Sequence, residues 1–161
     1  MEKKYKLTKE TKEINGYTLH RIEALRDFGD VKAGDKGGWI ESEKNLSHND
    51  NCWVYGSAEV YGGAWVCDGA WVYGDARVYG NAEVCGDARV KDGRDYIVFK
   101  NWWSSGRYFT WTRSNDMWRV GCFYGTGEEL IAKAYKDSEE SGREYERKVN
   151  YVESIKGELN K

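Results

Sequence analysis

Residues 52–91 decide the fold, and they read CWVYGSAEVYGGAWVCDGAWVYGDARVYGNAEVCGDARVK. Valine returns at every sixth position from Val54 to Val90, and alanine does the same from Ala58 to Ala88. A glycine follows five of these seven valines two positions later, and Asp68 and Asp92 fill that slot after the other two. A fixed short period indicates stacked copies of one structural unit.

Each repeating unit predicts one very short strand followed by a turn. A valine between two outward-pointing residues has the alternation of a strand. The glycine and its polar neighbour, as in Gly80-Asn81, favour a turn because these residue types tolerate unusual dihedral angles. A single unit cannot bury its valine, so the units must stack to form a core.

This repeat resembles the hexapeptide-repeat family of left-handed parallel β-helices. In that family three hexapeptides form one coil, so the resemblance implies that residues eighteen apart in the sequence stack. It implies a mainly β chain built on a short left-handed parallel β-helix, which begins near Leu46 and covers residues 46–93.

Stacking at that spacing sorts the outward residues into three faces. The first face holds an aromatic and basic set: Trp53, Trp71 and Arg89, beside Tyr55, Tyr73 and Lys91. The second face holds Glu59 over Arg77 and Tyr61 over Tyr79, and the third holds Trp65 over Glu83 and Cys67 over Cys85. The rings of the first face either pack on the same chain or a sister subunit, or form a ligand platform.

The segments on either side of the repeat predict two further modules. Residues 1–45 predict an N-terminal β cap that includes a hairpin turning at Asn15-Gly16. Residues 94–161 predict an α+β module with three antiparallel strands at 95–99, 107–113 and 117–124. A capping box at Thr126 opens a first helix, and a second helix begins near Gly142.

The composition favours a globular protein in the cytoplasm. Charged residues make up 32% of the chain and the net charge is −2. The N-terminus lacks the apolar run of a signal peptide, and no segment has the apolar length of a membrane span. We therefore expect the four cysteines to be reduced, with Cys67 and Cys85 as free thiols in repeat slots.

No catalytic residue, metal site or cofactor is predicted. Acyltransferases of the resembled family use a histidine as general base, and the candidates here are His20 and His48. His48 lies in a polar turn, which is typical of a surface or capping residue. Two thiolates on the third face do not complete a tetrahedral zinc site.

The second candidate binding region lies in residues 94–125, which carry five basic and two acidic side chains. Its aromatic and basic members are Trp102, Trp103, Arg107, Tyr108, Trp111, Arg113, Trp118 and Arg119. Such residues form the core of the small module, a surface for nucleotides or a protein interface. The small net charge argues against binding to extended duplex nucleic acid.

Three further stretches resemble small uncharacterised proteins of phages and prophages: Phe28-Gly-Asp-Val31, residues 37–47 and residues 120–130. That resemblance implies a non-enzymatic phage protein that binds and neutralises a host factor, either a defence protein or a small nucleotide signal. The β-helix family implies self-association as a trimer or dimer. The alternatives are a hexapeptide-repeat acyltransferase and a structural component of the phage particle.

Overall fold

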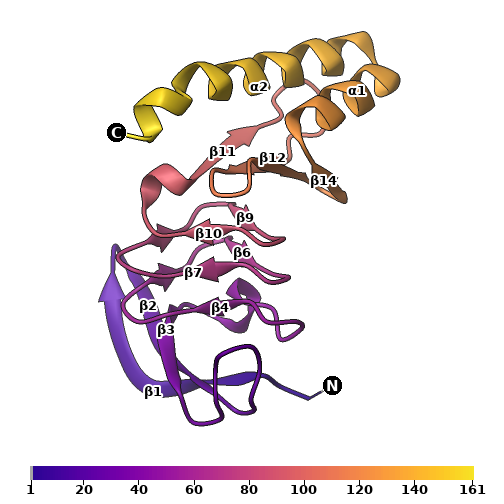
Figure 1. Cartoon of the computed structure of the whole chain (residues 1–161). Helices are drawn as coiled ribbons and strands as arrows, with labels where there is room; N and C mark the ends of the chain where they lie inside the picture. The colour runs from indigo at the N-terminus through magenta and orange to yellow at the C-terminus, as the bar shows by residue number, and fades with distance from the viewer. Residues whose placement is uncertain (1) are drawn as a thin grey trace.

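The computed structural model describes residues 2–161, which form three tiers (Figure 1). A long N-terminal hairpin lies at one end, the repeat occupies the middle, and a sheet covered by two helices lies at the other end. No helix in the described part of the chain is long and apolar enough to cross a membrane.

The repeat forms seven strands of two residues each, and these pair in parallel. The first face contains β4 (Trp53–Val54), β7 (Trp71–Val72) and β10 (Arg89–Val90), and the third contains β6 (Trp65–Val66) and β9 (Glu83–Val84). The second face contains β5 (Glu59–Val60) and β8 (Arg77–Val78). Trp53 pairs with Trp71, which also pairs with Arg89, so the predicted eighteen-residue stacking is confirmed.

The N-terminal segment joins the second face. Strands β1 (Tyr5–Ile14) and β2 (Tyr17–Ala24) form the hairpin, and β3 (Lys36–Ile40) pairs antiparallel with β2 and parallel with β5. Gly37 and Gly38 allow this approach, because a Cβ at either position would lie 2.6 Å from a carbonyl oxygen of the first coil. The result is one mixed five-stranded sheet that runs from the hairpin into the repeat.

The fold class predicted from the sequence needs correction. The strands belong to several small sheets, both mixed and antiparallel, and they do not form a closed, regular left-handed β-helix. The repeat strands are too short to continue a sheet alone, and one face merges with the antiparallel hairpin. The N-terminal strands are therefore part of the largest sheet.

The C-terminal module contains four strands, which corrects the prediction of three. They are β11 (Tyr96–Lys100), β12 (Tyr108–Thr112), β13 (Met117–Val120) and β14 (Phe123–Gly125). The predicted strand over residues 117–124 is split by a turn, where Gly121 adopts a φ of 55° and Val120 pairs with Phe123. Only glycine reaches this left-handed region without strain.

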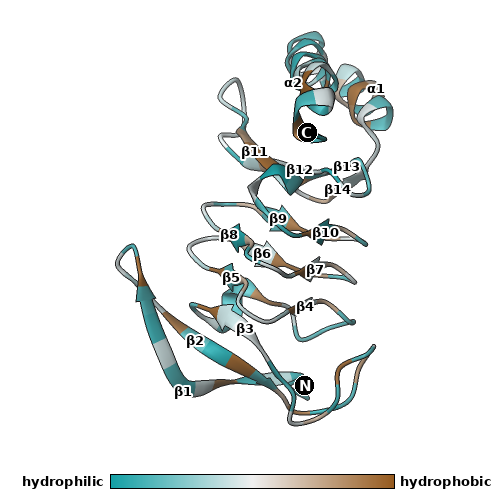
Figure 2. Ribbon diagram, turned by 60° about the vertical axis from the view of Figure 1, so that its left-hand side comes forward, coloured by the Kyte–Doolittle hydropathy of each residue, from teal (hydrophilic) through white to brown (hydrophobic). Residues whose placement is uncertain are grey.

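Two helices cover the outer face of this sheet (Figure 2). Helix α1 (Gly127–Asp137) begins at the capping box predicted from the sequence, in which Thr126 accepts from the Glu129 N–H. Helix α2 (Glu139–Leu159) begins three residues before the predicted start, because Ser138 caps it. The aromatic side chains Phe109, Trp111 and Trp118 fill the space between sheet and helices.

A second apolar core runs through the repeat. The periodic valines and alanines are all fully buried, and Leu46 and Cys52 continue their column. The sheet of the C-terminal module rests on the last coil with its other face, where Thr110 Oγ1 accepts a hydrogen bond from the Glu83 N–H. The candidate site lies at the seam between the repeat and the C-terminal sheet.

Candidate functional site

A groove of about 810 Å³ follows the seam between the second face of the repeat and strands β11 and β12. The repeat contributes Arg77, Tyr79 and Asn81, and the sheet contributes Tyr96, Lys100 and Tyr108. We refer to these six residues as the seam groove. They come from segments up to 31 positions apart in the sequence, from Arg77 to Tyr108, and meet only because β12 lies on the last coil.

The seam groove presents tyrosine rings to solvent. The Tyr79 side chain is 52% exposed and that of Tyr108 is 40% exposed. Tyr79 stacks on Tyr61 at a centroid distance of 5.3 Å, and Tyr61 contacts Tyr17 at 5.0 Å. The stack orients the Tyr79 ring, which leaves one flat face available for a ligand.

The phenol of Tyr96 is fixed inside the seam groove. Its hydroxyl donates to the Arg77 carbonyl oxygen at 2.8 Å, and burial raises the pKa of Tyr96 to about 12. This phenol therefore remains neutral at physiological pH and serves as a hydrogen-bonding group. It supports the backbone that carries Arg77.

Two cations at the groove have no carboxylate partner in the described residues 2–161. Lys100 and Arg107 are exposed, whereas Arg77 lies 3.0 Å from Glu59 and Arg119 lies 3.3 Å from Glu83. Lys100 lies 6.0 Å from the centre of the Tyr108 ring. An exposed cation beside an aromatic ring suits a ligand that carries both a ring and a negative charge.

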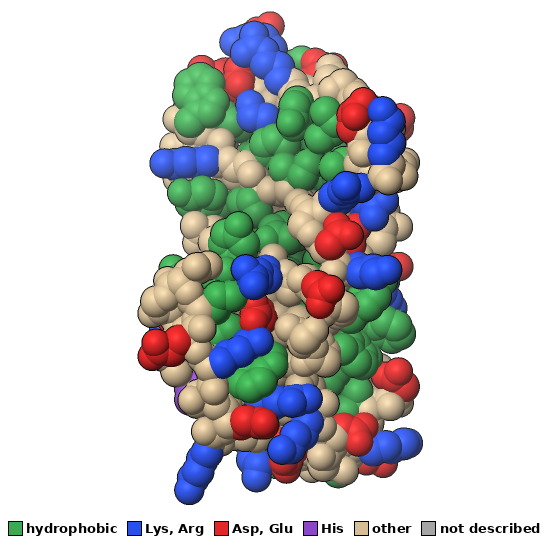
Figure 3. Space-filling view, turned by 90° about the vertical axis from the view of Figure 1, so that its left-hand side faces the viewer, with side chains coloured by type: hydrophobic (Ala, Val, Ile, Leu, Met, Phe, Trp, Pro, Cys, Tyr) green, Lys and Arg blue, Asp and Glu red, His purple; other side chains and the backbone are tan. Residues whose placement is uncertain are grey.

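Two smaller hollows extend the seam groove along the sheet. One, of about 460 Å³, is lined by Trp65, Asn81, Arg107 and Tyr108, and the other, of about 560 Å³, also contains Arg107 and Tyr108. Tyr108 therefore borders all three hollows. Figure 3 shows apolar side chains gathered over the C-terminal module and mixed charges over the lower half of that view.

The predicted ladder on the first face packs mainly within the chain. Trp53 is 1% exposed and its ring contacts Phe28 at 5.1 Å. The Arg89 guanidinium lies 3.9 Å from the centre of the Trp71 ring, and Tyr55 meets Trp71 edge-on. Tyr73 is half-buried on the same face. None of these residues lines a hollow described here.

The predicted aromatic surface of residues 94–125 divides between core and solvent. Trp111 and Trp118 are 0% and 1% exposed, so their assignment as binding residues is corrected. They face the helices, whereas Trp103 packs against Tyr145 at 5.0 Å and Trp102 is 65% exposed.

Two of the three arginines predicted for this surface are held in ion pairs. Arg113 Nε lies 2.9 Å from the Asp95 carboxylate, and Arg119 contacts Glu83. Of this predicted set, Arg107 reaches a hollow at the seam.

Sequence reasoning missed part of the seam groove. The sequence places Arg77 and Tyr79 on the second face and Tyr108 in the aromatic and basic segment, but it does not single out Asn81, Tyr96 or Lys100 as site residues. The available signal was the tyrosine that follows the repeat valines and the alternation of β12, which places Tyr108 opposite the buried Phe109.

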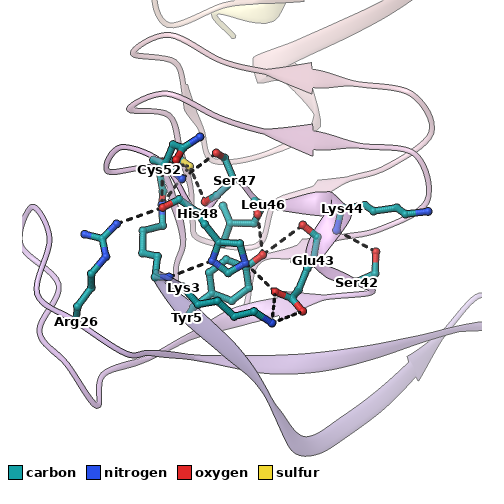
Figure 4. Close-up of polar contacts among 12 residues, drawn as sticks. Lys3, Tyr5, Arg26, Ser42, Glu43, Lys44, Leu46, Ser47, His48 and Cys52 are labelled. Carbon is teal, nitrogen blue, oxygen red and sulfur yellow. Dashed lines mark hydrogen bonds and ion pairs between the residues drawn. The ribbon is translucent and has the colours of Figure 1, made fainter. Parts of the chain in front are cut away.

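The histidine cluster at the N-terminal end of the repeat is fully hydrogen-bonded (Figure 4). His48 Nδ1 accepts from the Lys4 backbone N–H at 3.1 Å, and Nε2 lies 2.7 Å from a carboxylate oxygen of Glu43. The His48 ring stacks on Tyr5 at 4.1 Å, and its hydrogen bond lowers the pKa of Glu43. Both ring nitrogens are engaged, which leaves no free lone pair for a general base.

The other histidine, His20, also has a structural partner. Its Nδ1 lies 3.2 Å from the Thr8 carbonyl oxygen, within the N-terminal hairpin. Neither histidine lines the hollows at the seam. The chemistry expected of a single-chain acyltransferase centre is therefore not assembled by these residues.

The prediction that Cys67 and Cys85 are free thiols is wrong, because a disulfide joins them. Eighteen-residue stacking brings their Cα atoms to 4.7 Å, within the range that a disulfide spans. Cys52 is a buried free thiol and Cys122 is an exposed one. The ligand atoms of Cys67, Asp68 and Cys85 also lie within 4.8 Å of one another.

Comparisons with known proteins give one partial likeness. The chain is 38% identical over 61 residues to "Uncharacterized acetyltransferase YdcK" of Escherichia coli (strain K12). The match covers 33% of this chain and 19% of that protein. No protein-family model matches the chain. A likeness this short does not define a family.

Proposed function

We propose that this protein is a non-enzymatic binding protein whose seam groove holds a small ligand with a flat ring and a negative charge, as in a nucleotide. The observation that carries the proposal is the juxtaposition of exposed tyrosine rings with the unpaired Lys100 in the seam groove and with Arg107 in the adjoining hollows. Stacking of a base on an aromatic ring contributes about 1–3 kcal/mol. A hydrogen bond to a charged group adds about 1.5–3 kcal/mol.

Two cations suffice for a small phosphorylated ligand but not for a long nucleic acid. Lys100 pairs with Tyr108 across β11 and β12, and Arg107 precedes Tyr108 in the chain, so we propose that a ring on Tyr108 carries its phosphate toward these two cations. A duplex needs many more phosphate contacts. We therefore propose a mononucleotide or a short cyclic nucleotide as the ligand class.

The host-directed role is part of the proposal and rests on the resemblance to phage proteins. Capture of a nucleotide signal would remove that signal from a host defence system. A host protein held at the exposed Trp102 is the alternative target. Self-association as a dimer or trimer is proposed from the resemblance to hexapeptide-repeat proteins, and sedimentation of the purified chain tests it.

The test measures thermal stability and binding heat with AMP and cyclic di-AMP, with adenosine and inorganic phosphate as separated halves of the ligand. A ligand at about 100 times its dissociation constant adds about 2.7 kcal/mol to stability. We expect the phosphorylated nucleotides to bind more tightly than either half. Tyr108→Ala and Lys100→Ala should each weaken binding about tenfold.

Matched controls are Tyr135→Ala and Lys136→Ala, which alter exposed residues of α1 outside the seam groove. They should leave the dissociation constant unchanged. Two outcomes would refute the proposed ligand class. One is that the control variants weaken nucleotide binding as much as Tyr108→Ala and Lys100→Ala do, and the other is that neither nucleotide binds at millimolar concentration. In the latter case, retention of a host protein that depends on Trp102 would favour the protein target.

The second candidate is an acyltransferase, which the partial likeness to an acetyltransferase favours. A centre of this kind would need a base freed from its present partners, and His48 is the candidate because it contacts Glu43. Acetyl-CoA turnover that disappears in His48→Ala and persists in His20→Ala would support this function. Absence of turnover with any amine or alcohol acceptor would leave the binding function.

A further inference from the structure

On the third face of the repeat, the residues that follow the valines differ from those on the other two faces. The residue after each repeat valine is a tyrosine at Tyr55, Tyr61, Tyr73 and Tyr79, but on the third face it is Cys67 and Cys85. The next slot is glycine in five units, and Asp68 replaces it beside Cys67. Three residues with metal-binding side chains therefore occupy slots that the fold fills elsewhere with tyrosine and glycine.

The register of the stack brings these side chains together. Trp65 pairs with Glu83 and Val66 with Val84, so Cys67 lies directly beneath Cys85. The three ligand atoms lie within 4.8 Å of one another. The cysteines are 6% and 1% exposed, whereas Asp68 is exposed and closes the solvent side of the cluster.

A backbone hydrogen bond to the neighbouring coil fixes the position of the Asp68 side chain. Asp68 adopts a φ of 58°, the left-handed conformation that glycine occupies in the neighbouring units and that aspartate tolerates. One carboxylate oxygen accepts from the Gly86 N–H at 2.8 Å, and the other is left for a ligand. The hydrogen bond ties Asp68 to the coil that carries Cys85.

We propose that reduction of the Cys67–Cys85 disulfide creates a binding site for a zinc-type divalent cation, held by the two thiolates and the Asp68 carboxylate. In the first step two molecules of a cellular thiol reductant give two electrons and two protons to the disulfide and become a disulfide themselves. In the second step the cation binds, and each cysteine thiol releases its proton to solvent.

The ligand set selects the metal and the coordination. Two thiolates favour zinc over magnesium or calcium, which prefer oxygen ligands. Tetrahedral zinc bonds of 2.0–2.3 Å place ligand atoms roughly 3.5–3.8 Å apart, a spacing that the cluster reaches by small movements. The exposed side of Asp68 leaves the fourth position to water, as in zinc sites that keep an open coordination position.

The test uses Co²⁺ as a spectroscopic probe on the full chain, reduced with a phosphine. We expect one Co²⁺ per chain with thiolate-to-cobalt charge-transfer absorption, which Zn²⁺ displaces. The same protein with its disulfide intact should give no such absorption. Cys67→Ser and Cys85→Ser should abolish it, and Asp68→Asn should weaken Co²⁺ binding about tenfold.

The matched control is Cys122→Ser, which removes the exposed free thiol and should leave Co²⁺ binding unchanged. The intact and reduced wild-type protein provide a comparison that does not depend on any variant folding. Equal absorption in both states, no absorption in the reduced state, or loss of absorption in Cys122→Ser would overturn the proposal. Full binding by Asp68→Asn would overturn the three-ligand site.

Discussion

The two ends of the repeat leave backbone groups without a neighbouring coil, and different kinds of side chain bind them at each end. Along the stack the N–H groups of outward-facing residues donate to carbonyl oxygens of the following coil, as Trp53 does to Ala70 and Trp71 does to Ala88. Within residues 2–161, no preceding coil supplies such donors to the Cys52 and Leu46 carbonyl oxygens, and no following coil supplies acceptors to the Glu83 and Arg89 N–H groups. Neither set can be buried without a hydrogen-bond partner.

The N-terminal end supplies side-chain donors. The buried Lys4 ammonium donates to the Cys52 carbonyl oxygen at 2.7 Å, and the Tyr5 hydroxyl donates to the Leu46 carbonyl oxygen at 2.7 Å. The Asn45 amide donates to the Ala64 carbonyl oxygen at 2.8 Å. Each donor comes from a segment that precedes the first repeat strand.

The C-terminal end supplies side-chain acceptors. Thr110 Oγ1 accepts from the Glu83 N–H, Ser114 Oγ accepts from the Arg89 N–H at 2.7 Å, and Asp95 Oδ2 accepts from the Lys91 N–H at 2.6 Å. The comparison shows that the direction of the parallel stack dictates the residue types that close it. A lysine suits one end and an aspartate suits the other.

The largest expected effect comes from Asp95→Ala. The Asp95 side chain is buried, accepts from two backbone N–H groups and pairs with Arg113. Its loss leaves two part-buried N–H groups and the Arg113 guanidinium without their partner, so we expect the free energy of unfolding to fall by about 3 kcal/mol in urea denaturation. The control Asp137→Ala removes an exposed helix pair and should change stability by less than about 0.5 kcal/mol. Equal losses in the two variants would contradict the role given to Asp95.

The next effect comes from Lys4→Met, which keeps the length of the side chain and removes its donors. We expect a loss of about 2 kcal/mol, because the Cys52 carbonyl oxygen then remains buried without its partner. Lys9→Met, an exposed substitution in β1, the strand that follows Lys4, should be nearly neutral. If the Lys4→Met protein is as stable as the Lys9→Met protein, the Lys4 ammonium does not stabilise the N-terminal end of the repeat.

Lys4 also predicts a pH dependence. Burial lowers the pKa of Lys4 below its ordinary value of 10.5. Between the lowered pKa and 10.5 the unfolded chain holds more protons than the folded chain, so the contribution of Lys4 to stability rises with pH in that window. The difference in unfolding free energy between the wild type and Lys4→Met should therefore grow with pH there. A constant difference would show that burial does not shift this titration.

The smallest effect comes from Thr110→Val, an isosteric change at the other end. It removes the acceptor of the Glu83 N–H, and we expect a loss of about 1 kcal/mol. Amide hydrogen exchange sharpens the test, because the Glu83 amide should exchange faster while amides in the N-terminal hairpin do not. Thr18→Val on the exposed face of β2 is the matched control.

Features that depend on short patterns along the chain are predicted well from the sequence. The valine period predicts the six-residue unit, the resemblance to hexapeptide-repeat proteins implies the eighteen-residue pairing, and the start of α1 follows from Thr126 and Glu129. The turn at Gly121 was missed because Val120 and Phe123 continue an apolar run across it. Alternation showed that Phe109 and Trp111 share a face, but helices from later in the sequence decide that this face is buried.

The candidate site was harder to predict because it joins distant segments. Tyr79 and Tyr108 border one groove only because β12 lies on the last coil. The mixed five-stranded sheet likewise depends on contacts of β3 with β5, which no local pattern records. The stacking of Cys67 and Cys85 was predicted, but their disulfide was not. The expected reducing compartment led to the prediction of free thiols.

The match between the last coil and the side chains that close it also limits how such a chain can change in length. Because Thr110, Ser114 and Asp95 each match a different segment of the last turn, duplication of eighteen residues would present an identical docking surface to them. Duplication of a single six-residue unit would instead rotate that surface by one face and offer every acceptor the wrong donor. Growth and shrinkage of this architecture should therefore proceed in whole coils, with the two terminal modules carried along unaltered.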